Sequence, residues 1–183
     1  MSTEEYQHAF TEPIESTDKS GSSAAVLGVA VGEDRYLIPM IEVSEVIPIP
    51  KLARVPLTQP WFLGLANVRG NLYGITDLGV YLGGNPMPFN LKSRILLVSP
   101  SNKVYGAFVV NSMLGIRNLS EFTSVKSGKR KLPKGITTQY KDTEGRLWRE
   151  LSLFELIRDE KFLQIDANEL NKQVNLYLSY LIT

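Results

Sequence analysis

The sequence predicts an all-β protein, because three stretches each contain an apolar run, a polar turn and a second apolar run. These stretches cover residues 25–38, 95–110 and 136–151. Short runs rich in Val, Ile, Tyr and Phe, separated by Gly, Asn, Asp or Pro, are typical of antiparallel hairpins. No long helices alternate with these strands, which disfavours a doubly wound nucleotide-binding fold. Strands of this kind usually close into barrels or sandwiches, because closure removes exposed edges.

The segment after the first hairpin adds further strand and turn signals. Residues 43–47 are predicted to form a strand that places Glu45 near a surface. Gly64 and Gly70 bracket the run Leu-Ala-Asn-Val-Arg, and glycine at both ends predicts a tight backbone turn at each.

Helices are predicted to be few. Asp77 can cap a short helix that ends at Gly83-Gly84, and a second covers residues 153–158. A third begins at about Ala167. Asp166 stands just before it and Glu169 follows three residues later, which is the spacing of a capping box. It carries one apolar stripe at helical spacing: Leu170, Val174, Tyr177, Leu178 and Leu181. The stripe fits a helix packed on its own domain and a helix offered to a partner equally well.

Composition narrows the classes of function. The chain has 183 residues, a net charge of +1 and no cysteine, which excludes disulfides, thiol nucleophiles and cysteine-ligated metal sites. A single histidine, His8, leaves no Ser-His-Asp triad. The carboxylates are scattered, and none sits in an obviously apolar pocket. We therefore expect no catalytic residues, no metal site and no cofactor.

The length and charge pattern suggest one domain with two appendages. Residues 1–24 are predicted to be a flexible acidic tail, 25–166 the folded domain and 167–183 the C-terminal helix. No run approaches the roughly 18 apolar residues of a membrane span, and the acidic start is unlike a secretory signal. A cytoplasmic protein without direct membrane insertion is the expectation.

A basic cluster at residues 126–134 leaves one alternative function open. Its five Lys and Arg residues fit a solvated loop better than a ligand site. A β-barrel nucleic-acid-binding module using this loop is the alternative, which the absence of stacking aromatics and the near-zero net charge disfavour. We expect no nucleic-acid partner.

Arg69 is the most informative single residue. It stands between apolar neighbours and next to a glycine, a setting in which a guanidinium can be oriented by a carboxylate. The plainer interpretation is a surface charge whose pairing contributes at most about 1 kcal/mol.

The pattern around Arg69 resembles the CheW family of chemotaxis coupling proteins. It reads Gly64-x-x-Asn67-Val-Arg69-Gly70, with Val55-Pro56 before it, Asp77-Leu78 after it and Val43-x-Glu45-Val46 upstream. The resemblance covers about residues 26–165. With Trp61 included, the pattern is more similar still to the CheW-like adaptors of the type IV pilus twitching-motility pathway.

The resemblance implies two interlocked five-stranded β-barrels around a hydrophobic centre. It also implies a non-enzymatic signalling adaptor that couples the cytoplasmic tip of a methyl-accepting chemoreceptor to the regulatory domain of a CheA-type histidine kinase. Such an adaptor is recruited to membrane-associated receptor arrays. The flagellar chemotaxis pathway is the alternative to the pilus pathway.

Specific positions carry over from the family pattern. The receptor-binding residues would be Val43, Glu45, Gly64, Asn67, Arg69 and Gly70, with Glu45 orienting Arg69. The kinase-binding residues would be Gly106, Asn111 and Met113. Asn111-Ser112 stands where the family commonly has an acidic residue, which disfavours a charge-based contact there.

Overall fold

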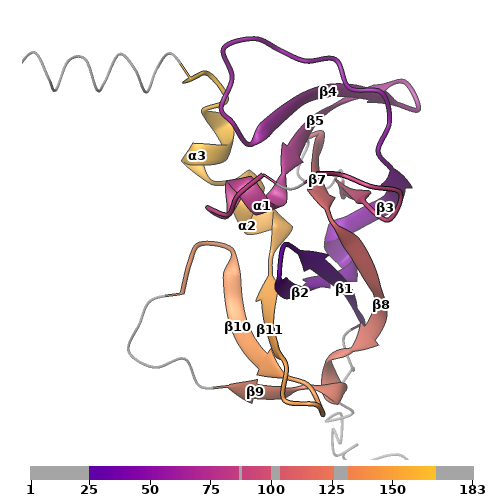
Figure 1. Cartoon of the computed structure of the whole chain (residues 1–183), viewed down its shortest axis with the longest axis vertical. Helices are drawn as coiled ribbons and strands as arrows, with labels where there is room; N and C mark the ends of the chain where they lie inside the picture. The colour runs from indigo at the N-terminus through magenta and orange to yellow at the C-terminus, as the bar shows by residue number, and fades with distance from the viewer. Residues whose placement is uncertain (1–24, 87, 100–103, 126–131, 168–183) are drawn as a thin grey trace, which may run out of the picture.

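Two β-sheets form the body of the protein (Figure 1). The structure is a computed structural model that describes residues 25–86, 88–99, 104–125 and 132–167. The six-stranded sheet has the order β8-β1-β2-β11-β10-β9 and the five-stranded sheet the order β3-β6-β7-β5-β4. The chain starts in the six-stranded sheet, builds the whole of the other sheet, and then returns, so the two units are interleaved in sequence.

The bounds of the elements are as follows. The six-stranded sheet contains β1 (Ala25–Val31), β2 (Asp34–Pro39), β8 (Ser112–Asn118), β9 (Thr123–Val125), β10 (Ile136–Lys141) and β11 (Leu147–Leu151). The five-stranded sheet contains β3 (Val43–Pro48), β4 (Phe62–Val68), β5 (Asn71–Asp77), β6 (Arg94–Val98) and β7 (Gly106–Val110). The helices are α1 (Leu78–Tyr81), α2 (Leu153–Ile157) and α3 (Glu160–Leu163), with 3-10 turns at Met40–Glu42 and Leu119–Glu121.

The predicted all-β class and all three predicted hairpins are confirmed. β1 pairs with β2, β6 with β7 and β10 with β11, each antiparallel. Two parallel pairings, β11 with β2 and β5 with β7, join the hairpins into sheets. The predicted five strands hold for one unit, whereas the other has six, and among the described residues the pairing in each sheet forms an open ladder.

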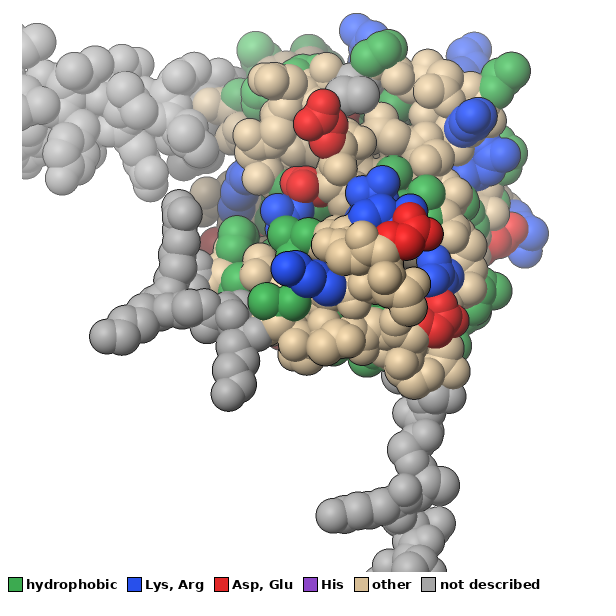
Figure 2. All heavy atoms as spheres, turned by 60° about the horizontal axis from the view of Figure 1, so that its bottom comes forward, with side chains coloured by type: hydrophobic (Ala, Val, Ile, Leu, Met, Phe, Trp, Pro, Cys, Tyr) green, Lys and Arg blue, Asp and Glu red, His purple; other side chains and the backbone are tan. Residues whose placement is uncertain are grey.

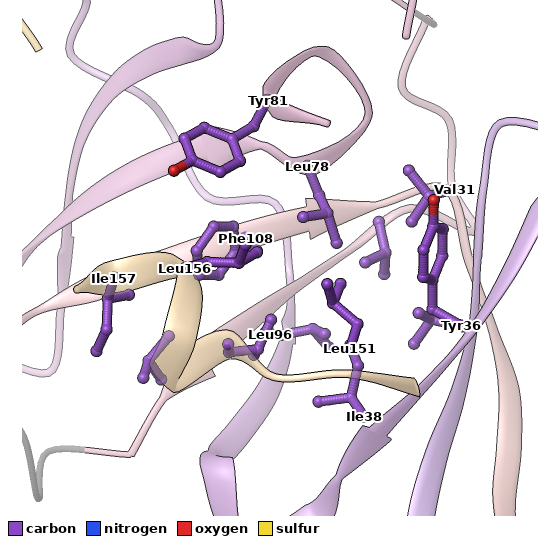
Figure 3. Packing of buried hydrophobic residues seen from close by; sticks show 14 of the residues in the cluster. Val31, Tyr36, Ile38, Leu78, Tyr81, Leu96, Phe108, Leu151, Leu156 and Ile157 are labelled. Atoms are coloured by element: carbon purple, nitrogen blue, oxygen red, sulfur yellow. The ribbon is translucent and has the colours of Figure 1, made fainter. Parts of the chain in front are cut away.

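Strands β6 and β7 of the five-stranded sheet are buried on both faces. In β6, Ile95 and Leu97 face the core of the five-stranded unit, while Leu96 and Val98 face a core shared by both sheets. Because successive side chains of a strand point to opposite faces, one apolar run supplies two cores. Figure 3 shows the shared core, where Ile38 of β2 and Leu151 of β11 lie near Leu96 of β6.

The short helices close the shared core. The Asp77 carboxylate accepts a hydrogen bond from the Val80 N–H at 3.1 Å, so the predicted cap of α1 is confirmed. The helix predicted at residues 153–158 is present as α2, and α3 was not predicted. The predicted acidic tail lies outside the described residues, as does the predicted C-terminal helix beyond Ala167.

A buried carboxylate joins the two sheets. Glu42 lies where the chain crosses from β2 to β3, and its side chain accepts hydrogen bonds from the Ser152 hydroxyl at 2.8 Å and the Phe154 N–H at 3.2 Å. It also accepts one from the Leu153 N–H. An N-terminal helix turn offers unpaired N–H groups, and an anion stabilises them. Glu42, Asp77 and Asp142 are all buried, and each accepts hydrogen bonds within the fold.

Candidate functional site

The β4–β5 hairpin ends in a two-residue turn that holds Arg69 outward. Val68 pairs with Asn71, which leaves Arg69 and Gly70 as the turn residues, with φ of 52° and 86°. Positive φ at both positions is the geometry of a type I′ turn, and the left-handed conformation costs a non-glycine residue roughly 1–2 kcal/mol. The Asn67 side chain stabilises the turn, because its Oδ1 accepts a hydrogen bond from the Gly70 N–H at 3.0 Å.

Glu45 orients the arginine, as the resemblance implied. Arg69 Nη2 donates to Glu45 Oε1 at 2.7 Å. The Arg69 side chain is 77% exposed and that of Glu45 30% exposed, so the pair lies at the surface. β3, which carries Glu45, and β4 are the two edge strands of the five-stranded sheet. The ion pair therefore links the two edges of this sheet and leaves most of the guanidinium in solvent.

One exposed apolar side chain lies beside the β4–β5 turn. Leu72, 57% exposed, lies on β5 two residues beyond the turn and pairs with Asn67 of β4, whereas Val46 follows Glu45 and therefore points to the other face of β3. Apolar side chains around an oriented charge are the usual composition of a protein-binding surface, in which the charge provides specificity. We call Glu45, Asn67, Arg69, Gly70 and Leu72 the Arg69 surface.

Gly64 lies within strand β4, so the tight turn predicted there is wrong. It lies inside β4 at an irregularity in the pairing with β5, and its φ is 129°. A Cβ at this position would lie 2.3 Å from the carbonyl oxygen of Ala53. Ala53 pairs with Leu65 across the edge of β4, with N–O distances of 2.8 and 2.9 Å. Gly64 is therefore buried, and its lack of a side chain lets this segment cover the strand edge.

Val43 contributes little to the Arg69 surface. It is half-buried at the start of β3 and packs against the shared core. Of the six predicted receptor-binding residues, the structure brings Glu45, Asn67, Arg69 and Gly70 together at the surface.

The three predicted kinase-binding residues do not form one patch. Gly106 is buried at the start of β7, where a Cβ would lie 3.3 Å from the Phe162 ring, so its position is explained by packing. Asn111 follows the other end of β7, and its Oδ1 accepts a hydrogen bond from the Gly32 N–H at 2.7 Å. Met113 is half-buried on β8 and packs against the shared core. Buried Gly106 is thus unavailable for direct contact in this conformation.

A second arginine–carboxylate pair lies in the β10–β11 turn. Asp142 Oδ2 accepts from Arg146 Nε at 2.7 Å and from the buried indole Nε1 of Trp148 at 2.9 Å. Its Oδ1 accepts from the N–H groups of Glu144 and Arg146. Burial alone would raise the pKa of the Asp142 carboxyl, but these hydrogen bonds outweigh it and hold the pKa well below its usual range. The Asp-x-x-Gly turn sequence was the available signal for this site.

An acidic cleft lies between the β1–β2 turn and α1. It measures about 350 Å³, and Asp34 and Asp77 are among its lining residues. Asp34 pairs with Arg149 at 2.6 Å, and Asp77 caps α1. Burial raises the pKa of the Asp77 carboxyl, which the hydrogen bonds from Val80 and Gly79 partly offset. Both carboxylates are thus engaged within the fold, and in the described ranges no group of three or more His, Asp or Glu is arranged to hold a metal ion.

Only part of the basic cluster at residues 126–134 lies within the described residues. Lys126, Lys129, Arg130 and Lys131 lie outside the described residues, and Lys134 pairs with Asp159 at 3.0 Å. On the face drawn in Figure 2, the Lys and Arg side chains are interspersed with Asp and Glu. None of the helices in the described part of the chain has the length and apolar character of a membrane span.

The fold and the Arg69 surface together define a two-sheet β-protein with an outward-held arginine on a hairpin turn. The CheW-like domain model matches residues 25–161, and the chain belongs to this family. The crystal structure of the scaffolding protein TtCheW from Thermoanaerobacter tengcongensis has the same fold, with a TM-score of 0.64 at 16% identity over 75% of this chain and 94% of that one.

Curated relatives match part of the chain. Protein PilI of Pseudomonas aeruginosa is 33% identical over 92 residues, which are 50% of this chain and 51% of PilI. The chemotaxis protein CheW of Helicobacter pylori is 29% identical over 83 residues, 45% of this chain and 50% of that protein. The matched segments thus span about half the length of these two relatives.

Proposed function

We propose that this protein is a non-enzymatic adaptor that couples the cytoplasmic tip of a methyl-accepting chemoreceptor to the regulatory domain of a CheA-type histidine kinase. The observation that carries the proposal is the Arg69–Glu45 pair, with its 2.7 Å contact and its 77% exposed arginine side chain. An exposed pair of this kind contributes little to folding, with typical values of 0.2–1 kcal/mol. A strained turn that holds such a pair outward is better explained by recognition than by stability.

The chemistry of the Arg69 surface fits a receptor helix that presents a carboxylate. A guanidinium has five donors in a planar fork, and Glu45 occupies one side of it. Leu72, on β5 opposite Asn67, can contact apolar side chains of the same helix. Glu45, Asn67, Arg69 and Gly70 are the proposed receptor-binding residues, whereas Val43 is half-buried and Gly64 is buried.

The kinase would bind elsewhere on the molecule. Asn111 lies between β7 and β8, where the chain returns to the six-stranded sheet, and Met113 lies near the start of β8. We keep these two as the proposed kinase-facing positions, while Gly106 acts through packing. Separate surfaces allow both partners to bind one adaptor at the same time.

Titration of the cognate receptor signalling domain tests the receptor surface. Arg69→Glu replaces the donor with a like charge facing Glu45, and we expect at least a tenfold loss of affinity with little change in the thermal melt. Lys141→Glu is the matched control, because it makes the same change of charge at an exposed position on β10 of the other sheet. Wild-type affinity in Arg69→Glu would contradict the proposed surface.

The double variant Glu45→Arg with Arg69→Glu separates orientation from contact. It restores an ion pair between the same positions but moves the guanidinium from the turn to β3. We expect receptor binding to stay lost, because the receptor must meet the guanidinium at position 69. Recovery of binding would mean that the pair matters only for the shape of the turn.

We further propose that the pathway is that of the type IV pilus, on the basis of the similarity to PilI. A deletion strain should lose pilus-mediated twitching and keep flagellar swimming. Intact twitching with defective swimming would assign the protein to the flagellar pathway instead. We also propose that the adaptor works in the cytoplasm at membrane-associated receptor arrays, where a fluorescent fusion should form foci that disappear in a receptor deletion.

A further inference from the structure

An open apolar groove runs beside β4, on the segment that connects β3 to that strand. It has a volume of about 450 Å³. Its apolar walls come from three parts of the chain: Leu52, Val55, Pro60, Phe62, Leu63 and Phe89. Val55 and Phe89 are both exposed. Apolar side chains gathered in an open groove and rimmed by polar residues, here Arg54, Thr58 and Gln59, can form a binding surface.

The chain after the described residues begins at the rim of this groove. Thr58 and Gln59 belong to the lining, and they pair with the last described residues. The Gln59 N–H donates to the Ile165 carbonyl at 2.8 Å, and the Ala167 N–H donates to the Leu57 carbonyl at 3.0 Å. Residues 168–183 are therefore tethered at a fixed point next to the groove.

The composition of this segment matches the groove. Sixteen residues follow Ala167, and a helix of that length spans about 24 Å. The stripe from Leu170 to Leu181 is one apolar face, and Glu169, near its start, can meet exposed Arg54 on the rim. A short tether gives the segment a local concentration near the groove in the millimolar range, well above that of a free partner in dilute solution.

We propose that residues 168–183 form a helix whose apolar stripe packs into this groove of the same chain. The helix covers Val55 and Phe89, and the polar side of the helix, which includes Asn175 and Ser179, faces solvent. The proposal is independent of the receptor and kinase assignments, because the groove contains none of the residues used for them.

The absence of cysteine in the chain allows a direct test. Spin labels on Lys51→Cys, beside the groove, and Ser179→Cys, on the polar side of the helix, report the distance between them by pulsed electron resonance. The docked helix predicts one narrow distance distribution that does not change on dilution. A broad distribution would contradict docking, and one that narrows only at high concentration would indicate a second copy and overturn the proposal.

Two adjacent substitutions provide the matched control. Val174→Lys places a charge in the stripe and should broaden the distance distribution, while Asn175→Lys places the same charge on the polar side and should leave it unchanged. In a separate single-cysteine variant, Val55→Cys, Val174→Lys should increase the rate of maleimide labelling several-fold over Asn175→Lys. Equal labelling rates of the two variants, with coincident thermal melts, would contradict the proposal. A charge in the apolar stripe would then have no effect on access to position 55.

Discussion

The β4–β5 and β10–β11 turns each carry an arginine that pairs with a carboxylate at a nitrogen–oxygen distance of 2.7 Å. The first pair is exposed to solvent, whereas the carboxylate of the second is buried. Arg69 and Glu45 are 77% and 30% exposed, whereas Arg146 and Asp142 are 39% and 2% exposed. Asp142 also accepts from the indole of Trp148, which is buried in the core of the six-stranded sheet.

The difference lies in what surrounds the carboxylate. At the β10–β11 turn, backbone and indole donors converge on Asp142, so the pair fixes the turn to the core. At the β4–β5 turn, the backbone is fixed by Asn67, and the arginine is left to solvent. The same pair chemistry thus fixes one turn to the core and leaves an exposed guanidinium on the other, which is the group that we propose for receptor binding.

The largest loss of stability is expected from Gly64→Ala, which disturbs the packing of the Ala53 segment against strand β4. A methyl group would meet the Ala53 carbonyl at 2.3 Å in a backbone conformation with φ of 129°. We expect destabilisation by about 2–4 kcal/mol from overpacking and backbone strain. Denaturant unfolding measures it. A stable Gly64→Ala protein that fails to bind receptor would instead make Gly64 part of the contact surface.

Asp142→Asn should follow, because it replaces one of the two carboxylate oxygens that accept hydrogen bonds in the β10–β11 turn with an NH2 donor and removes the negative charge. The hydrogen bonds hold the folded pKa of Asp142 below that of the unfolded chain, so the ionised carboxylate stabilises the fold above about pH 4. This stabilisation is lost as the pH falls toward the folded-state pKa. The melting temperature of Asp142→Asn should be lower at pH 7, and its difference from wild type should shrink below pH 4. An equal difference at both pH values would contradict this origin.

Asn67→Ala should have a smaller effect on the β4–β5 turn. It removes the hydrogen bond to the Gly70 N–H, worth about 1 kcal/mol. Receptor affinity should also fall, because Arg69 loses its fixed position. Asn67→Asp keeps an oxygen acceptor and should restore both properties. If the aspartate variant behaves like the alanine variant, the hydrogen bond is not what positions Arg69.

Arg69→Ala should have the smallest effect on stability. An exposed pair contributes at most about 1 kcal/mol, and its loss is partly offset because holding the two side chains in one geometry costs side-chain entropy. Chemical denaturation of Arg69→Ala and Arg146→Ala side by side should show the larger loss for Arg146→Ala, which leaves Asp142 without its guanidinium partner. The reverse order would make the β4–β5 pair a structural one.

The sequence was sufficient where the determining contacts are local. The three hairpins follow from apolar runs around turn residues, and the cap of α1 follows from Asp77 three residues before Val80. The Glu45–Arg69 pair was anticipated only through the resemblance, since 24 residues separate the partners.

The rest depends on contacts between distant parts of the chain. Glu42 caps α2 from more than one hundred residues away, and no local pattern marks it. Gly64 was predicted to lie in a turn, because the sequence does not show the contact that requires a glycine there. That contact is with Ala53, which pairs along the edge of β4 in the folded chain. Gly106 is small because Phe162 of the unpredicted α3 packs over it.

The most direct test of this account measures receptor affinity and thermal stability on the same preparations of Arg69→Glu and Arg146→Glu. We predict that Arg69→Glu loses receptor binding at an unchanged melting temperature, while Arg146→Glu melts lower and, where still folded, binds as wild type does. Wild-type binding by Arg69→Glu, or a loss of binding that tracks its melting temperature, would contradict the assignment of the β4–β5 turn as the recognition surface.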